Sequence, residues 1–87
     1  MSNIVFTEIA FSHYLGWQAE DKKVLKKINE LLKSISRDGA LDGIGKPEKL
    51  KWRVGEYSRR IDDKNRLVYE VDGKNIVVKS CRGHYEE

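Results

Sequence analysis

The sequence predicts a small α+β domain with the element order β-α-α-β-β-β-β. An apolar pattern of helical period covers residues 22–36, and short runs rich in β-branched and aromatic residues fill most of the second half. Gly, Asn and Asp turn signals separate these runs after only a few residues. Because short connections join neighbouring strands, we expect an antiparallel sheet with two helices packed on one face.

Length and composition indicate one domain, residues 1–87, with a thin core, since hydrophobic residues make up 39% of the chain. The 17 Lys and Arg residues exceed the 14 Asp and Glu residues and give a net charge of +3, which favours an anionic partner, either nucleic acid or an acidic protein. The single cysteine, Cys81, excludes an internal disulfide. Because we find no leader and no membrane-spanning segment, we expect a cytoplasmic protein with no membrane partner.

The first half of the chain predicts one strand and two helices. Residues 3–7 are typical of a strand, and residues 8–20 show a mixed helical spacing that Gly16 interrupts. Asp21 can cap a second helix over residues 22–36, whose lysine-rich face lies opposite an apolar one. The apolar residues of this second helix are Val24, Leu25, Ile28, Leu31, Leu32 and Ile35.

The second half predicts a long loop and four strands. Glycines and the only proline, Pro47, interrupt residues 37–48, and a loop of this length is often functional. The pair Asp72-Gly73 predicts a tight hairpin between the last two strands. The four expected strands cover residues 50–54, 57–61, 66–71 and 76–81.

His84 is the first candidate for chemistry. Histidine changes its charge near neutral pH, so His84 can act as a general acid or base, or it can be an exposed terminal residue without a role. Tyr85 beside it can stack on a nucleobase or pack at the end of the sheet. His13 lies in the middle of an expected helix, where a surface or packing role is favoured.

Four arginines accompany His84. Arg59 and Arg60 share one strand, Arg66 opens the next, and Arg82 directly precedes His84. Neighbouring strand residues point to opposite faces, so we expect either Arg59 or Arg60 to be solvated or to support the fold. Arginines near a histidine favour a phosphate site, and a basic solvated sheet face is the alternative.

The glycine loop, residues 43–48, does not predict nucleotide binding. It lacks the Walker A spacing, and no Ser or Thr follows Lys46. Glu48 follows the rigid Pro47 and leads into the sheet, as either a catalytic acid or a surface residue. One cysteine and two distant histidines make no metal cluster, and no serine triad is indicated. We expect no metal and no cofactor.

Four segments, in this order and spacing, resemble the YoeB toxins, which are RelE-like, ribosome-dependent mRNA interferases of bacterial toxin–antitoxin systems. The resemblance covers nearly the whole chain and implies a RelE-like fold. The segments are DKKVLKKINEL at 21–31, GIGKPEKLK at 43–51, YSRRI at 57–61 with RLVY at 66–69, and CRGHY at 81–85.

The resemblance also implies a catalytic set. The acid after the GKP-like loop is Glu48, the arginine that opens the HRLVY-like strand is Arg66, and the terminal histidine and tyrosine are His84 and Tyr85. Asn65 stands where the family frequently has histidine. The remaining basic residues are expected to bind RNA or to support the site. They are Lys51, Arg59, Arg60 and Arg82.

The hypothesis that fits these residues is cleavage of RNA by its own 2′-hydroxyl. Glu48 would act as base, His84 as acid and Arg66 as transition-state stabiliser with help from Lys51, without a metal. Glu86 and Glu87 extend the chain beyond the usual His-Tyr end and bring negative charge next to His84.

The partners follow from the resemblance. They are mRNA in the A site of the 70S ribosome, a cognate YefM-like antitoxin, and operator DNA only through the toxin–antitoxin complex. A homodimer is left open. Two alternatives remain: a non-enzymatic co-repressor that binds the antitoxin, and a ribonuclease that does not need the ribosome.

Overall fold

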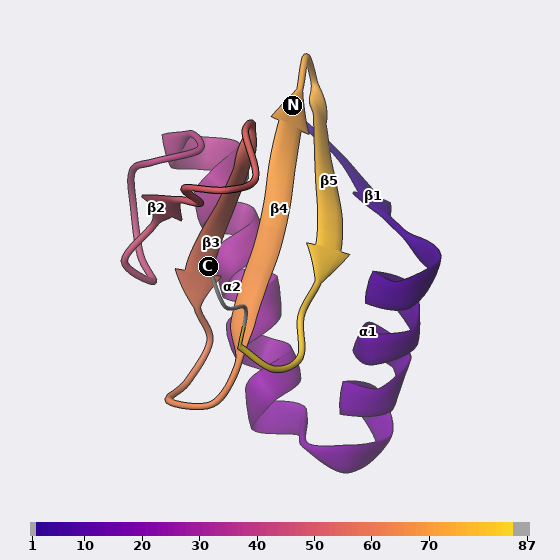
Figure 1. The fold of residues 1–87 in the computed structure, drawn as a ribbon. Coiled ribbons are helices and arrows are strands. Elements are labelled where there is room, and N and C mark those ends of the chain that lie inside the picture. Colours follow the sequence, from indigo (N-terminus) through magenta and orange to yellow (C-terminus); the bar gives the residue numbers. More distant parts are fainter. Residues whose placement is uncertain (1, 85–87) are drawn as a thin grey trace.

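Two helices and five strands make up residues 2–84, the part of the chain that the computed structural model describes (Figure 1). The expected element order is confirmed. The elements are β1 (Asn3–Phe6), α1 (Glu8–Glu20), α2 (Lys22–Asp38), β2 (Glu48–Lys49), β3 (Glu56–Arg60), β4 (Arg66–Asp72) and β5 (Asn75–Ser80).

The sheet has the strand order β1-β5-β4-β3-β2. Strands β2 to β5 pair with their chain neighbours in antiparallel fashion, as expected from the short connections. β1 instead pairs in parallel with β5, with Ile4 opposite Ile76, so the whole sheet is mixed and not purely antiparallel. Since the helices carry the chain from one sheet edge to the other, β1 is left to pair with the last strand.

The prediction of a strand over residues 50–54 is wrong. β2 contains only Glu48–Lys49, and the chain then turns. The backbone N–H of Leu50 donates to the carbonyl of Glu56 at 3.0 Å, and the N–H of Glu56 donates to the carbonyl of Arg53 at 2.9 Å. These bonds close residues 50–55 into a loop. Gly55, with φ 85°, completes the turn in a conformation that favours glycine.

Side-chain caps start both helices. The hydroxyl of Thr7 accepts from the N–H of Ala10 at 3.1 Å, and Asp21 accepts from the N–H groups of Lys23 and Val24, as its sequence position predicts. α2 ends at Asp38, two residues beyond its expected end. Neither helix in residues 2–84 is long and apolar enough to cross a membrane.

The main core lies between the helices and one face of the sheet, which confirms that both helices pack on one face. In Figure 1, α2 crosses behind β3 and β4, and α1 lies beside β5. The buried residues are Ala10, Trp17, Ile28, Leu31, Leu32, Ile35, Ile61, Leu67, Tyr69, Ile76, Val78 and Cys81.

The opposite face, which we call the open face, carries the side chains that alternate with this core. Ser58 lies opposite Val68 and Arg60 opposite Arg66 in the pairing of β3 with β4. Leu50 and Val68 are buried although neither belongs to the helix-side core. Figure 1 shows the loop after β2 passing in front of β3, on the side away from α2, so this loop covers part of the open face.

Candidate functional site

Glu48, Ser58 and Arg66 meet on the open face. Glu48 lies opposite Ser58 in the pairing of β2 with β3, and Arg66 begins β4. Nη1 of Arg66 lies 3.4 Å from Oε1 of Glu48, and the hydroxyl of Ser58 donates to the same oxygen at 3.5 Å. The carboxylate of Glu48 is half exposed, so the ion pair contributes little to stability. The arrangement instead places a carboxylate and a guanidinium next to each other at the surface.

His84 follows a residue that is bonded to the start of β4. The carbonyl of Gly83 accepts from the N–H of Arg66 at 3.0 Å, and the N–H of Gly83 donates to Oδ1 of Asn65 at 2.8 Å. His84 itself is exposed. The chain is thus held beside Arg66 one residue before His84. Tyr85, the other terminal candidate, lies outside the described residues.

Asn65 is fixed by the turn between β3 and β4. Oδ1 of Asp62 accepts from the N–H groups of Lys64 and Asn65, each at 2.8 Å, and from the side-chain amide of Asn65 at 3.1 Å. Burial works against the ionised form, but these hydrogen bonds outweigh it and lower the pKa of Asp62. The turn therefore presents the oxygen of Asn65 to Gly83.

α1 holds the same terminal segment from its other side. The indole N–H of Trp17 donates to the carbonyl of Cys81 at 2.8 Å, and the N–H of Cys81 donates to Nδ1 of His13 at 3.2 Å. The guanidinium of Arg82 lies 3.9 Å from the Trp17 ring centre and pairs with Glu20. Partial burial, with a smaller contribution from Arg82, lowers the pKa of His13. Arg82 therefore contacts α1 and secures the segment that leads to His84.

Arg59 and Arg60 are separated by the alternation of β3, as expected. Arg60 is exposed, whereas Arg59 is fully buried and bonded on all three guanidinium nitrogens. Arg59 is thus the residue that supports the fold. It donates to the hydroxyls of Tyr69 and Ser34 and to the carbonyls of Ile44, Gly39 and Asp42, at 2.6–2.9 Å.

Packing around Arg59 leaves no room for side chains at Gly43 and Gly45 of the glycine loop. A Cβ at Gly43 would lie 2.2 Å from the hydroxyl of Ser34, and a Cβ at Gly45 would lie 2.5 Å from Leu31. Both glycines have positive φ, 103° and 86°. The close spacing of these glycines therefore reflects a tight fit against α2 and β3.

Lys51 lies in the loop after β2, three residues after Glu48, and is exposed. Sequence reasoning missed three contributors to this region: Ser58, the bond of Asn65 to Gly83, and the attachment of Cys81 to α1. Ser58 could have been found, because it is two residues from Arg60 and shares its face. The other contacts join residues 18 or more positions apart and leave no local signal.

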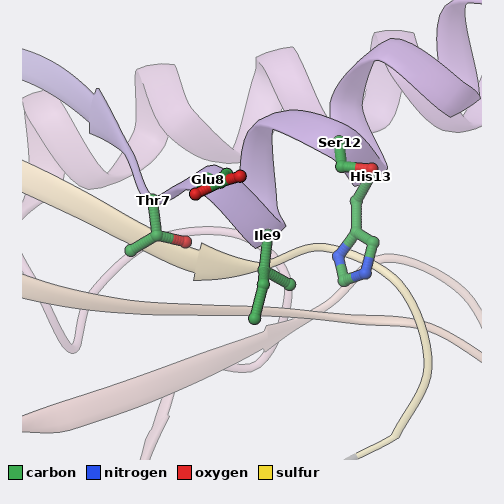
Figure 2. A pocket seen from close by; sticks show the side chains of 5 residues that line it. All are labelled: Thr7, Glu8, Ile9, Ser12 and His13. Atoms are coloured by element: carbon green, nitrogen blue, oxygen red, sulfur yellow. The ribbon is translucent and has the colours of Figure 1, made fainter.

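A separate hollow of about 640 Å³ lies at the first turns of α1, lined by Thr7, Glu8, Ile9, Ser12 and His13. Figure 2 shows the side chains of Ile9 and His13 on the same side of α1, pointing toward the end of β5 and the segment after it. None of Glu48, Arg66 or His84 lines this hollow. We therefore place the candidate site on the open face.

The chain is similar to known proteins over nearly its whole length. Residues 6–85 match the family described as YoeB-like toxin of bacterial type II toxin-antitoxin system. Toxin YoeB of Synechocystis sp. is 50% identical over 84 residues, which cover 95% of this chain and 96% of that protein.

Two solved structures from Staphylococcus aureus are similar as well. A YoeB dimer is 59% identical with a TM-score of 0.92, covering 97% of this chain and 98% of that one. The toxin of a heterotetrameric YoeB-YefM toxin-antitoxin complex is 58% identical with a TM-score of 0.91, covering 98% and 99%. This chain therefore belongs to the YoeB-like toxins of bacterial type II toxin–antitoxin systems.

Proposed function

We propose that this toxin is an endoribonuclease that cleaves mRNA in the A site of the ribosome and thereby inhibits translation. One observation carries the proposal: the 3.4 Å pair of Glu48 and Arg66 on the open face, with Gly83 bonded to the backbone of Arg66 one residue before His84. A carboxylate, a guanidinium and an imidazole are the groups that cleavage by an internal 2′-hydroxyl requires.

The proposed reaction proceeds in one displacement. The carboxylate of Glu48 takes the proton of the 2′-hydroxyl, and the 2′-oxygen attacks the adjacent phosphorus. The bond from phosphorus to the 5′-oxygen breaks, and the imidazolium of His84 donates a proton to that leaving oxygen. The products are a 2′,3′-cyclic phosphate and a 5′-hydroxyl, and no metal takes part.

Arg66 and Lys51 supply positive charge in this scheme. The guanidinium of Arg66 donates to the non-bridging oxygens of the pentavalent phosphate, where negative charge develops. Lys51 adds a second cation from the loop after β2. Tyr85 stacks on or orients a base, and Arg60 contacts RNA from the exposed surface of β3.

The partners we propose are those of the similar complexes. A cognate YefM-like antitoxin binds the toxin, since a chain 58% identical forms a complex with YefM. The toxin also forms a homodimer, as the similar Staphylococcus aureus chain does. Operator DNA is contacted only through the toxin–antitoxin complex.

A translation assay on a defined mRNA, with and without 70S ribosomes, tests the proposal. Primer extension should show cleavage in the A-site codon only when ribosomes are present, and His84→Gln should abolish it. Because His84 is exposed, the thermal unfolding of the variant should match that of the wild type.

Two outcomes contradict the proposal. Cleavage of naked RNA at many sites would identify a ribonuclease independent of the ribosome. No cleavage under either condition, with intact binding of the antitoxin and its operator, would identify a non-enzymatic co-repressor.

A further inference from the structure

The Trp52 loop, residues 50–55, presents two large apolar side chains to solvent. Trp52 is 77% exposed and Val54 is 99% exposed. The other tryptophan, Trp17, is only 6% exposed, which is closer to the usual environment of this residue type. Burial of an exposed tryptophan ring against a ligand contributes favourable binding free energy, because the ring is large and apolar.

The loop is held in a closed conformation. Leu50, 4% exposed, anchors its start on the open face, and its N–H donates to the carbonyl of Glu56. The N–H of Glu56 donates back to the carbonyl of Arg53, and the side chains of Arg53 and Glu56 lie 3.5 Å apart. A loop that is already closed loses less conformational entropy when Trp52 binds a ligand.

Positive charge alternates with the aromatic side chain. Lys49 and Lys51 are exposed, and the side chain of Arg53 is 53% exposed. An exposed aromatic ring between cations is typical of surfaces that bind single-stranded nucleic acid, where the ring stacks on a base and the cations contact phosphates. An acidic peptide would use these cations but would not require the flat indole.

The loop is continuous with the proposed catalytic cluster. Trp52 is four residues from Glu48, so the two Cα atoms lie within ~14 Å of each other even if the chain is fully extended. Figure 1 shows the loop on the side of the sheet away from α2, where Glu48 and Arg66 also lie. A nucleic acid strand held at Glu48 therefore passes within reach of Trp52.

We propose that Trp52 stacks on a base of the mRNA close to the scissile phosphate, which Lys51 contacts, while Arg53 contacts an adjoining phosphate. Trp52 is then a specificity-determining residue, because the strength of stacking depends on the base. This inference rests on the proposed function, since it assigns the ligand of the same site.

A double-mutant cycle between Trp52 and the base tests the inference. Dissociation constants are measured for labelled toxin on ribosomes programmed with an mRNA that is normal or carries one abasic nucleotide, placed in turn at the positions around the scissile phosphate. All toxins carry His84→Gln, so the mRNA stays intact and binding is measured even if the toxin does not cleave.

Trp52→Ala should weaken binding to normal mRNA about 5- to 150-fold, the range typical of a lost base stack. At one abasic position, the toxin with Trp52 should lose a similar factor of affinity. With the mRNA abasic at that position, Trp52→Ala should weaken binding no further. Trp52→Phe should retain most of the affinity. Val54→Ser is the matched control, because Val54 is an even more exposed apolar residue of the same loop, and this variant should bind as the parent does.

Three results would overturn the inference. Trp52→Ala could bind normal mRNA as the parent does. At every abasic position, Trp52→Ala could still weaken binding by the same factor relative to the parent toxin, which would place the ring on something other than an mRNA base. Trp52→Ala could weaken binding of the antitoxin but not of the programmed ribosome, which would make the loop a protein-binding surface. Absence of cleavage by the wild type would instead refute the proposed function, since binding is scored separately.

Discussion

Arg59 and Arg60 are adjacent and identical, yet they lie in opposite environments. The guanidinium of Arg59 is buried and donates five hydrogen bonds, three of them to carbonyls of the chain between α2 and β2, which they hold against β3. Arg60 lies on the open face and is exposed. The sequence predicts that the two differ, because alternation is a property of any strand. It could not predict which one is buried, since that depends on the face that the helices cover.

Arg59→Met should therefore lower the free energy of unfolding by about 3 kcal/mol, because it leaves buried carbonyls and hydroxyls without their donor. Arg60→Met is the matched control, and we expect a change of no more than ~0.5 kcal/mol. Urea unfolding of both variants checks this. Equal losses would show that the bonds of Arg59 contribute nothing specific.

His13 should make stability depend on pH. Burial, and then Arg82, lower the pKa of His13 in the folded chain, so the unfolded chain binds this proton at higher pH. The free energy of unfolding should thus fall as the pH drops below the ordinary value of 6.5 and level off below the folded pKa. Protonated Nδ1 also cannot accept the N–H of Cys81.

Urea unfolding between pH 7.5 and pH 5 measures this effect. His13→Gln should remove much of the decline, whereas His84→Gln should keep it, because His84 is exposed. A decline that survives in His13→Gln would assign it to other groups.

At the scale of elements, the predictability of the sequence follows the range of the interactions. α2 was readily predicted, because its apolar period and its Asp21 cap are local, and so was the hairpin at Asp72-Gly73. The loop after β2 is an exception: the bonds that turn the chain, from Leu50 to Glu56 and from Glu56 to Arg53, are local, but the composition of residues 50–54 is typical of a strand. The parallel pairing of β1 with β5 joins residues more than 70 positions apart and has no sequence signature.

The candidate site shows the same division. The sequence singles out Glu48 and Arg66 as candidates, and their side chains do meet at 3.4 Å, although their catalytic roles stay a prediction. The attachment of the terminal segment was not predicted, because it depends on α1 and on the turn between β3 and β4 packing against one segment.

This attachment predicts that Asn65 positions His84. Asn65→Ala removes the acceptor of the Gly83 N–H and should lower the cleavage rate at saturating ribosomes about 10- to 100-fold, with little change in affinity for ribosomes. Lys64→Ala is the matched control, because the Lys64 side chain is exposed in the same turn and only its backbone N–H bonds to Asp62. If both variants lose stability and rate in proportion, Asn65 is only structural.

At the scale of the whole molecule, both helices pack on one face of the sheet, and Glu48 and Arg66 lie on the other. The open face thus combines Glu48, Arg66 and the basic loop after β2 in a chain of net charge +3. Such an arrangement suits a polyanionic ligand, whose binding releases counterions and weakens with salt.

Lys51→Gln should therefore reduce the steepness of a plot of log affinity for programmed ribosomes against log salt by about 0.7, the value for one phosphate contact to a single strand. Lys22→Gln, at the exposed start of α2, should leave the slope unchanged. An equal effect of both would point to general charge and not to a contact of Lys51.

The central claim is that Glu48, Arg66 and His84 together cleave RNA through its 2′-hydroxyl. End-group analysis of mRNA cleaved on ribosomes tests it most directly, with Glu48→Gln, Arg66→Gln and His84→Gln beside the wild type. We predict a 2′,3′-cyclic phosphate and a 5′-hydroxyl from the wild type, and at least ~100-fold slower cleavage by each variant. A 5′-phosphate with a 3′-hydroxyl, or an undiminished rate in any of the three variants, would contradict the account.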